Sequence, residues 1–100
     1  MPFHLKVLAA PEGEEAGRKY ALAEGDNLAG RVSPPSAIVL AGTKVSKKHC
    51  VFRVSGRSVR VEDLKSSNGI FVNGKQVSAA ELKVKDRLVV GEYTLEVGEG

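Results

Sequence analysis

The segment from Lys44 to Cys50 carries the densest group of chemically active side chains in this 100-residue chain. It reads Lys-Val-Ser-Lys-Lys-His-Cys, so three ammonium groups, a hydroxyl and an imidazole fall within its first six residues. Such groups suit an oxyanion, because charge-assisted hydrogen bonds to phosphate are about twice as strong as neutral ones. A lysine-rich loop that stands alone is more often a solvated turn, so its meaning depends on the rest of the chain.

Basic residues concentrate in the middle of the chain. Residues 31–60 hold seven arginines and lysines and no acidic residue, whereas segments 1–30 and 61–100 are both net acidic. The net charge of +3 therefore hides an asymmetry that points to an anionic partner on one face. Nucleic acid, a lipid headgroup and a phosphoprotein all fit, and charge alone does not choose among them.

Length and composition indicate a single domain. A chain of 100 residues can bury a core without disulfides or metal. Cys50 is the only cysteine, which excludes an internal disulfide and a multi-cysteine metal site. Met1–His4 does not resemble the start of a signal peptide, and no apolar run approaches the ~18 residues of a membrane span. We expect a soluble, cytoplasmic domain or a soluble piece of something larger.

Short alternating segments predict the strands that must position these groups. Alternation of apolar and polar residues, or a short apolar run, predicts strands at about 3–7, 18–24, 37–40, 50–54, 59–62, 70–72, 82–85, 88–90 and 93–97. Many short strands separated by turns predict an all-β sandwich or barrel. We further expect the two terminal strands to lie side by side.

Turn-forming residues separate these strands. Gly25-Asp26-Asn27 is predicted to be a turn, Pro34-Pro35 a stiff loop, and Ser55–Ser58 a hairpin turn. The Asn-Gly pairs at 68–69 and 73–74 predict two tight turns, because both residue types tolerate positive φ.

Three loops between the predicted strands offer complementary groups. Arg31 offers a bidentate fork to phosphate, and Ser46 offers a short hydroxyl donor. The Ser66–Asn68 segment adds a carboxamide that can donate and accept, and so can clamp a peptide backbone. Since a sandwich collects alternate loops at one end, these groups could form one site.

Four motifs in order resemble the forkhead-associated (FHA) domain. They are Gly30-Arg31, Ser46-Lys47-Lys48-His49, Asp63-Leu64-Lys65-Ser66-Ser67-Asn68-Gly69 and Val72-Asn73-Gly74, and the later segment 82–91 resembles the family's closing motif. The resemblance implies an FHA-like sandwich of two antiparallel sheets with about eleven short strands. It also implies one domain over residues 1–100, with the motifs in residues 28–97.

The resemblance implies a non-catalytic phosphothreonine-peptide-binding module for phosphorylation-dependent protein–protein interaction in signalling. It implies no cofactor, no metal, no nucleic acid and no membrane, and a monomer or a domain of a larger protein. By position, the phosphate-binding residues would be Arg31, Ser46, Lys47 and Ser67; Asn68 would bind the peptide backbone, Lys44 would set specificity, and His49, Ser66 and Asn73 would brace the loops. An acidic residue three positions beyond the phosphothreonine is our hypothesis for the partner of Lys44.

The sequence departs from the family pattern at three places. Ile70 stands where threonine is usual, Lys47 where arginine is frequent, and the loop with Pro34-Pro35 is slightly compact. Because Arg31, Ser46 and Asn68 are all present, we expect phosphate binding to be retained.

Other functions are open but less well supported. Ser46, His49 and Asp63 contain the ingredients of a hydrolase triad but lack a Gly-x-Ser-x-Gly elbow, and His49-Cys50 is a poor metal pair, because neighbours on a strand point to opposite faces. Cys50 is expected to be buried. A nucleic-acid binder that uses the basic segment, and an FHA scaffold that assembles through a sheet face without phosphate, are the two alternatives to phosphopeptide binding.

Overall fold

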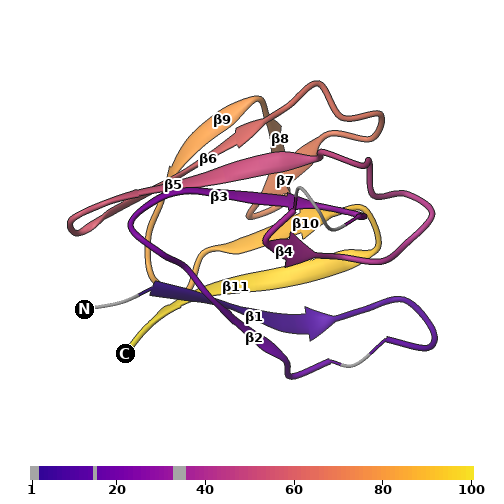
Figure 1. Cartoon of the computed structure of the whole chain (residues 1–100), viewed down its shortest axis with the longest axis horizontal. Coiled ribbons are helices and arrows are strands. Elements are labelled where there is room, and N and C mark those ends of the chain that lie inside the picture. The colour runs from indigo at the N-terminus through magenta and orange to yellow at the C-terminus, as the bar shows by residue number, and fades with distance from the viewer. Residues whose placement is uncertain (1–2, 15, 33–35) are drawn as a thin grey trace.

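The chain forms two β-sheets packed face to face (Figure 1). The computed structural model describes residues 3–14, 16–32 and 36–100, and within them the chain has eleven strands and no helix. One sheet has the order β2-β1-β11-β10-β7-β8, and its strands are β1 (Phe3–Ala9), β2 (Lys19–Ala21), β7 (Ile70–Val72), β8 (Lys75–Val77), β10 (Arg87–Val90) and β11 (Tyr93–Glu99). The other has the order β4-β3-β5-β6-β9, with β3 (Gly25–Gly30), β4 (Ile38–Val39), β5 (Cys50–Ser55), β6 (Ser58–Asp63) and β9 (Ala79–Leu82). The predicted two-sheet sandwich is confirmed; its one parallel contact joins β3 and β4.

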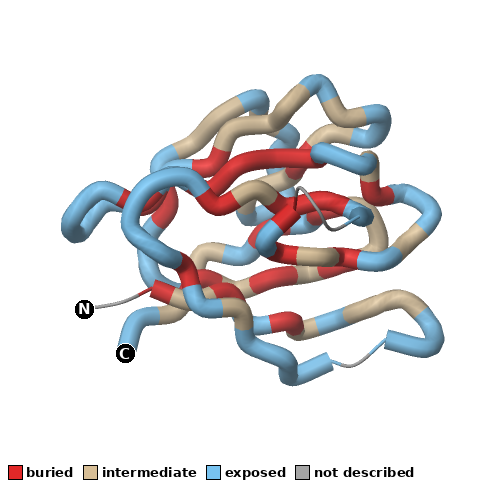
Figure 2. Tube along the Cα trace, viewed as in Figure 1, coloured by how far each residue is buried: buried red, intermediate tan, exposed pale blue. Residues whose placement is uncertain are grey.

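The core lies between the sheets, where each strand contributes alternate residues (Figure 2). Leu5 of β1, Phe52 of β5 and Leu95 of β11 are fully buried, and each such side chain stabilises the fold by roughly 1.5–3 kcal/mol relative to exposure. The terminal strands β1 and β11 pair in antiparallel fashion, as expected. Cys50 is also buried in this core, as predicted.

Turn positions predicted from Gly and Asn are partly confirmed. Ser55 pairs with Ser58 across the β5–β6 hairpin. Asn73 and Gly74 have φ values of 50° and 86° and join β7 to β8, whereas in the other Asn-Gly pair only Gly69, at 77°, has positive φ. The Pro34-Pro35 loop lies outside the described residues.

The prediction of a turn at Gly25–Asn27 is wrong, because these residues begin β3 and pair with β5. The side chain of Asn27 is buried and donates to the carbonyl of Phe52 on β5, at 3.1 Å, and to that of Ala23, at 2.9 Å. The pairing with β5 and the long-range hydrogen bond to Phe52 outweigh the local turn preference of glycine, aspartate and asparagine.

Two other strand boundaries differ from the prediction. The alternation at 82–85 predicted a strand, but β9 ends at Leu82, and Lys83 donates its N–H to the carboxylate of Asp86 in a turn where Lys85 has a φ of 78°. Only Lys19–Ala21 of the segment predicted at 18–24 forms a strand. Sheet pairing, which a single sequence does not reveal, decides these boundaries.

The topology brings four connections to one end of the sandwich. The last residues of β3 and β6 and the first residue of β5 are neighbours, since Cys50 pairs with both Ala29 and Asp63. In the other sheet, Ile70 at the start of β7 pairs with Val90 at the end of β10. Residues 31–32 and 36–37 and the segments 40–49, 64–69 and 91–92 therefore lie at this end, called here the loop end. No helix in the described residues is long and apolar enough to cross a membrane.

Candidate functional site

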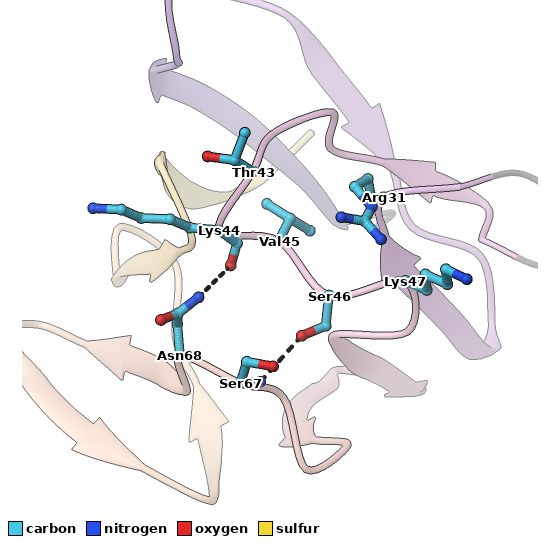
Figure 3. A pocket seen from close by; sticks show the side chains of 8 residues that line it. All are labelled: Arg31, Thr43, Lys44, Val45, Ser46, Lys47, Ser67 and Asn68. Atoms are coloured by element: carbon cyan, nitrogen blue, oxygen red, sulfur yellow. Dashed lines mark hydrogen bonds between the residues drawn. The ribbon is translucent and has the colours of Figure 1, made fainter.

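A pocket of about 350 Å³ opens at the loop end (Figure 3). It is lined by Arg31, Thr43, Lys44, Val45, Ser46, Lys47, Ser67 and Asn68. All six residues predicted to bind phosphate, bind the peptide backbone or set specificity are in this lining. The structure thus brings together groups from three loops that are far apart in the sequence.

Gly30 allows the loop of Ser46 to approach β3. A Cβ atom at Gly30 would collide with the carbonyl oxygen of Lys47, so any larger residue would push the two segments apart. The close approach lets the backbone N–H of Arg31 donate to the carbonyl of Ser46 at 3.1 Å. The glycine of the Gly-Arg motif therefore sets the distance between the guanidinium-bearing residue and the hydroxyl-bearing loop.

Ser46 Oγ accepts a hydrogen bond from the backbone N–H of Ser67 at 3.1 Å (Figure 3). A serine hydroxyl has one proton and two lone pairs, so this contact leaves its proton free to donate. The contact also joins the 40–49 loop to the 64–69 loop across the floor of the pocket. Ser46 therefore keeps a hydroxyl proton that it can donate to a group in the pocket.

Asn68 connects the same two loops on the other side of the pocket. Its Nδ2 donates to the carbonyl of Lys44 at 2.9 Å, and the residue is exposed (Figure 3). One amide proton is used in this way, which leaves a second proton and Oδ1 for a ligand. The carboxamide is fixed in orientation and retains both donor and acceptor capacity.

His49 is fully buried and bonds two of the loops that surround the pocket. Its Nδ1 accepts from the backbone N–H of Ser46 at 3.1 Å, and its Nε2 lies 2.8 Å from the carbonyl oxygen of Gly69. Since Nδ1 accepts, the ring proton is on Nε2 and is donated to Gly69. With both nitrogens engaged by backbone groups, the ring holds two loops together and contacts no serine hydroxyl.

Ser66 and Asp63 hold the 64–69 loop in shape. The hydroxyl of Ser66 donates to one carboxylate oxygen of Asp63, and its N–H donates to the other at 3.2 Å. Ser66 Oγ in turn accepts from the N–H of Gly69 at 2.9 Å. The interpretation of Ser46, His49 and Asp63 as a hydrolase triad is therefore contradicted, because Asp63 binds Ser66 rather than His49.

Asn73, by contrast, lies at the opposite end of β7 from the pocket. Its Nδ2 donates to Asp86 at 3.1 Å, and its Oδ1 accepts from the N–H of Arg87 at 3.0 Å. It thus joins the β7–β8 turn to the turn before β10. Its bracing contacts act on the far end of the sandwich, not on the site.

Glu92 is a positioning residue that the sequence reasoning missed. Its carboxylate accepts from the N–H and hydroxyl of Thr43, at 3.0 and 2.9 Å, and from the N–H of Lys44 at 3.1 Å. Desolvation acts to raise the pKa of Glu92, but these hydrogen bonds outweigh it and lower the pKa below its ordinary value. The only available signal was its place directly after Gly91 at the end of the closing motif.

The cations around the pocket are exposed and differ in direction. In Figure 3 the side chains of Lys44 and Lys47 extend away from the pocket on opposite sides, whereas the guanidinium of Arg31 is turned toward Ser46. None of these three is in an ion pair with a described residue; the recorded pairs join Arg53 to Asp26 and Glu62, and Arg87 to Glu96. The three cationic groups are therefore free of ion pairs with the described residues.

Cys50 and Ile70 are two further residues whose side chains are buried in the core. Burial, and then the charge of Asp63, raise the pKa of the Cys50 thiol to about 12, which keeps it protonated. Ile70 is fully buried in the core, so its aliphatic side chain takes the place of a hydroxyl without facing the pocket. Among the described residues, no group of three or more His, Cys, Asp and Glu side chains could hold a metal ion.

Comparison with known proteins gives consistent results. The FHA domain family matches residues 16–91. The glycogen accumulation regulator GarA of Mycolicibacterium smegmatis is 34% identical over 95 residues, which is 95% of this chain and 60% of that protein. The chain thus spans less than two thirds of the length of this curated relative.

Solved structures resemble the whole fold. A structure from a study of phosphothreonine-dependent FHA domain interactions is 30% identical, with a TM-score of 0.87, and the match covers 100% of this chain and 98% of the other. The FHA domain of FhaA, solved in complex with the intracellular domain of a second protein, is 32% identical, with a TM-score of 0.83 and coverage of 95% and 98%.

Proposed function

The chain belongs to the FHA domain family, and on that premise we propose that it is a non-catalytic module that binds a phosphothreonine-containing segment of a partner protein. A phosphorylated threonine carries about −1.5 to −2 charge at neutral pH and three strong acceptor oxygens. The observation that carries the proposal is the meeting of Arg31, Ser46 and Asn68 from three separate loops around one pocket. A single domain over residues 1–100 remains part of the proposal.

The phosphate is proposed to bind between Arg31 and Ser46. The guanidinium, which has no recorded partner among the described residues, offers a bidentate fork, and Ser46 offers its free hydroxyl proton. Ser67 lines the same pocket, and Lys47 adds a point charge once its flexible side chain turns inward. These charged hydrogen bonds support micromolar affinity, about −8 kcal/mol.

The backbone of the peptide is proposed to bind Asn68. Its remaining amide proton and Oδ1 can bond the main chain next to the phosphothreonine, as the family resemblance implies. Lys44 is proposed to contact the peptide residue three positions after the phosphothreonine. Because Lys44 is exposed, an acidic residue there would gain only a modest surface contact, about 0.2–1 kcal/mol.

The absence of catalysis is proposed from the way the polar groups are used. His49 is buried with both ring nitrogens bonded to backbone groups, so it cannot act as a general base for Ser46. Asp63 is occupied by Ser66. The pocket is thus suited to binding an anion, and the switch is the partner's phosphorylation. A cytoplasmic location stays a prediction.

A degenerate phosphothreonine peptide library tests this function. We expect wild type to enrich phosphothreonine peptides, Arg31→Ala to lose that enrichment, and unphosphorylated and phosphoserine libraries to bind weakly. Equal enrichment by both proteins, or no phospho-dependence, would refute the proposal. A steep salt dependence together with tolerance of Arg31→Ala would favour nucleic-acid binding, and phosphate-independent capture would favour assembly through a sheet face.

A further inference from the structure

Lys48 and Lys65 lie at the loop end beyond the residues proposed to bind the phosphate, and Lys47, which is proposed to add charge at the phosphate, directly precedes Lys48. We call Lys47, Lys48 and Lys65 the lysine patch; all three are exposed. The N–H of Leu64 donates to the carbonyl of His49 at 2.9 Å and extends the pairing of β5 with β6 by one residue. Lys48 and Lys65 are the next residues outward on the two segments, so the backbone brings them to adjacent positions.

No lysine of the patch forms an ion pair with another residue that the structure describes. The recorded ion pairs are formed by Arg53 and Arg87, in the sheets. The carboxylate of Asp63, two residues before Lys65, is occupied by the N–H and hydroxyl of Ser66. Since like charges at adjacent positions repel, an anion from outside would be attracted to all three ammonium groups.

Lys47 and Lys44 leave the pocket on different sides, and Lys48 directly follows Lys47 in the chain. In Figure 3 Lys47 leaves the pocket on the side of Arg31, whereas Lys44 leaves it on the side of Asn68. An extended peptide that crosses the pocket would therefore meet Lys44 on one side of its phosphothreonine and the lysine patch on the other.

We propose that the lysine patch is a second anionic subsite, which takes carboxylate or phosphate groups on the N-terminal side of the phosphothreonine. This inference rests on the proposed function. There, Lys44 contacts the residue three positions after the phosphothreonine, so the C-terminal side of the peptide lies at Lys44. The opposite side, at the lysine patch, is then the N-terminal side. The preferred ligand is then a segment with acidic or phosphorylated residues directly before its phosphothreonine. The patch would select among phosphothreonine proteins, while the pocket would supply phosphate dependence.

Fluorescence anisotropy with four labelled peptides tests the subsite. Each contains one phosphothreonine; one has neutral flanks, one has three aspartates directly before it, one has a phosphoserine three residues before it, and one has an aspartate three residues after it. We expect wild type to bind the second and third about fivefold more tightly than the first, because each surface ion pair adds little. This gain should shrink with added salt.

The decisive variant is Lys48→Ala/Lys65→Ala, which leaves the proposed phosphate ligands intact. We expect it to lose the gain from N-terminal anions and to keep wild-type affinity for the neutral and C-terminally acidic peptides. Lys75→Ala/Lys83→Ala removes the same charge from exposed positions at the far end of the sandwich and should keep the gain. If only the aspartate peptide or only the phosphoserine peptide binds wild type more tightly than the neutral peptide, that result identifies the anion that the subsite takes.

Several results would overturn the inference. If wild type does not bind the peptides with N-terminal anions more tightly than the neutral peptide, or if Lys48→Ala/Lys65→Ala still does, the subsite is contradicted. If the double variant loses affinity only for the C-terminally acidic peptide, the proposed position of the subsite is wrong. Duplex DNA that binds wild type more tightly than any peptide, through the same two lysines, would make the patch a nucleic-acid contact. If the neutral phosphothreonine peptide binds no better than its unphosphorylated form, the proposed function itself fails and the inference fails with it.

Discussion

Replacing Arg31 by alanine should weaken phosphopeptide binding without weakening the fold. The Arg31 side chain is exposed and forms no recorded ion pair or hydrogen bond within the described residues, and its backbone N–H bond to Ser46 survives the change. The cost in stability should therefore stay within about 0.5 kcal/mol, as for other surface substitutions. Removing one partner of a charged, hydrogen-bonded pair costs about 2–5 kcal/mol when the pair is desolvated. Because the pocket is open, we expect Arg31→Ala to cost binding free energy from the lower part of this range, about 2–3 kcal/mol. This corresponds to a Kd that is roughly 30- to 150-fold higher.

Isothermal titration calorimetry with one phosphothreonine peptide measures this loss. Arg31→Lys keeps the charge but loses the fork, and should fall between wild type and Arg31→Ala, at about tenfold. Arg57→Ala removes an equal charge from the β5–β6 hairpin at the far end and should bind like wild type. If Arg31→Ala and Arg57→Ala weaken binding equally, the loss reflects net charge alone and the reasoning for a local fork is refuted.

Three further substitutions test the support beneath the pocket. Gly30→Ala places a Cβ against the carbonyl of Lys47; we expect more than tenfold weaker peptide binding and about 1–3 kcal/mol lower stability by urea unfolding, and wild-type affinity would contradict this. His49→Ala removes a fully buried ring and leaves two partly buried backbone groups without partners, so urea unfolding should show a loss of about 3 kcal/mol, and a loss below about 1 kcal/mol would be inconsistent with its bracing role. Because hydrogen bonds lower the pKa of Glu92, its contribution to stability is complete above the ordinary value of 4.5 and is lost as pH falls through the lowered pKa. Glu92→Gln should remove that part of the acid sensitivity in thermal melts from pH 3 to 7, and an unchanged pH profile would count against it.

The sequence predicted most strands because their burial follows local alternation. Phe3, Leu5 and Val7 alternate with polar residues, and all three are buried. The start of β3 could not be predicted in this way, since Gly25 and Asp26 favour turns, and only pairing with β5 makes them a strand. The edge strand β8, with two exposed residues of its three, carries no apolar pattern that would reveal it.

The residues of the site could be predicted, but not their geometry. The order of the motifs predicted Arg31, Ser46 and Asn68 as binding residues, and the topology places them around one pocket. Asn73 belongs to the same set of motifs yet does not reach the pocket, because β7 separates the 64–69 loop from the β7–β8 turn. The contribution of Glu92 depends on a turn in the other sheet, and no local sequence feature indicates which loop it holds.

Backbone NMR of the ¹⁵N-labelled protein, titrated with a phosphothreonine peptide and with its unphosphorylated form, tests the central claim most directly. The account predicts that the phosphorylated peptide produces its largest amide shifts at Arg31, Ser46, Ser67 and Asn68, while the unphosphorylated peptide leaves them unchanged. Shifts of equal size with both peptides, or shifts confined to the β5–β6–β9 face or the far end of the sandwich, would contradict it.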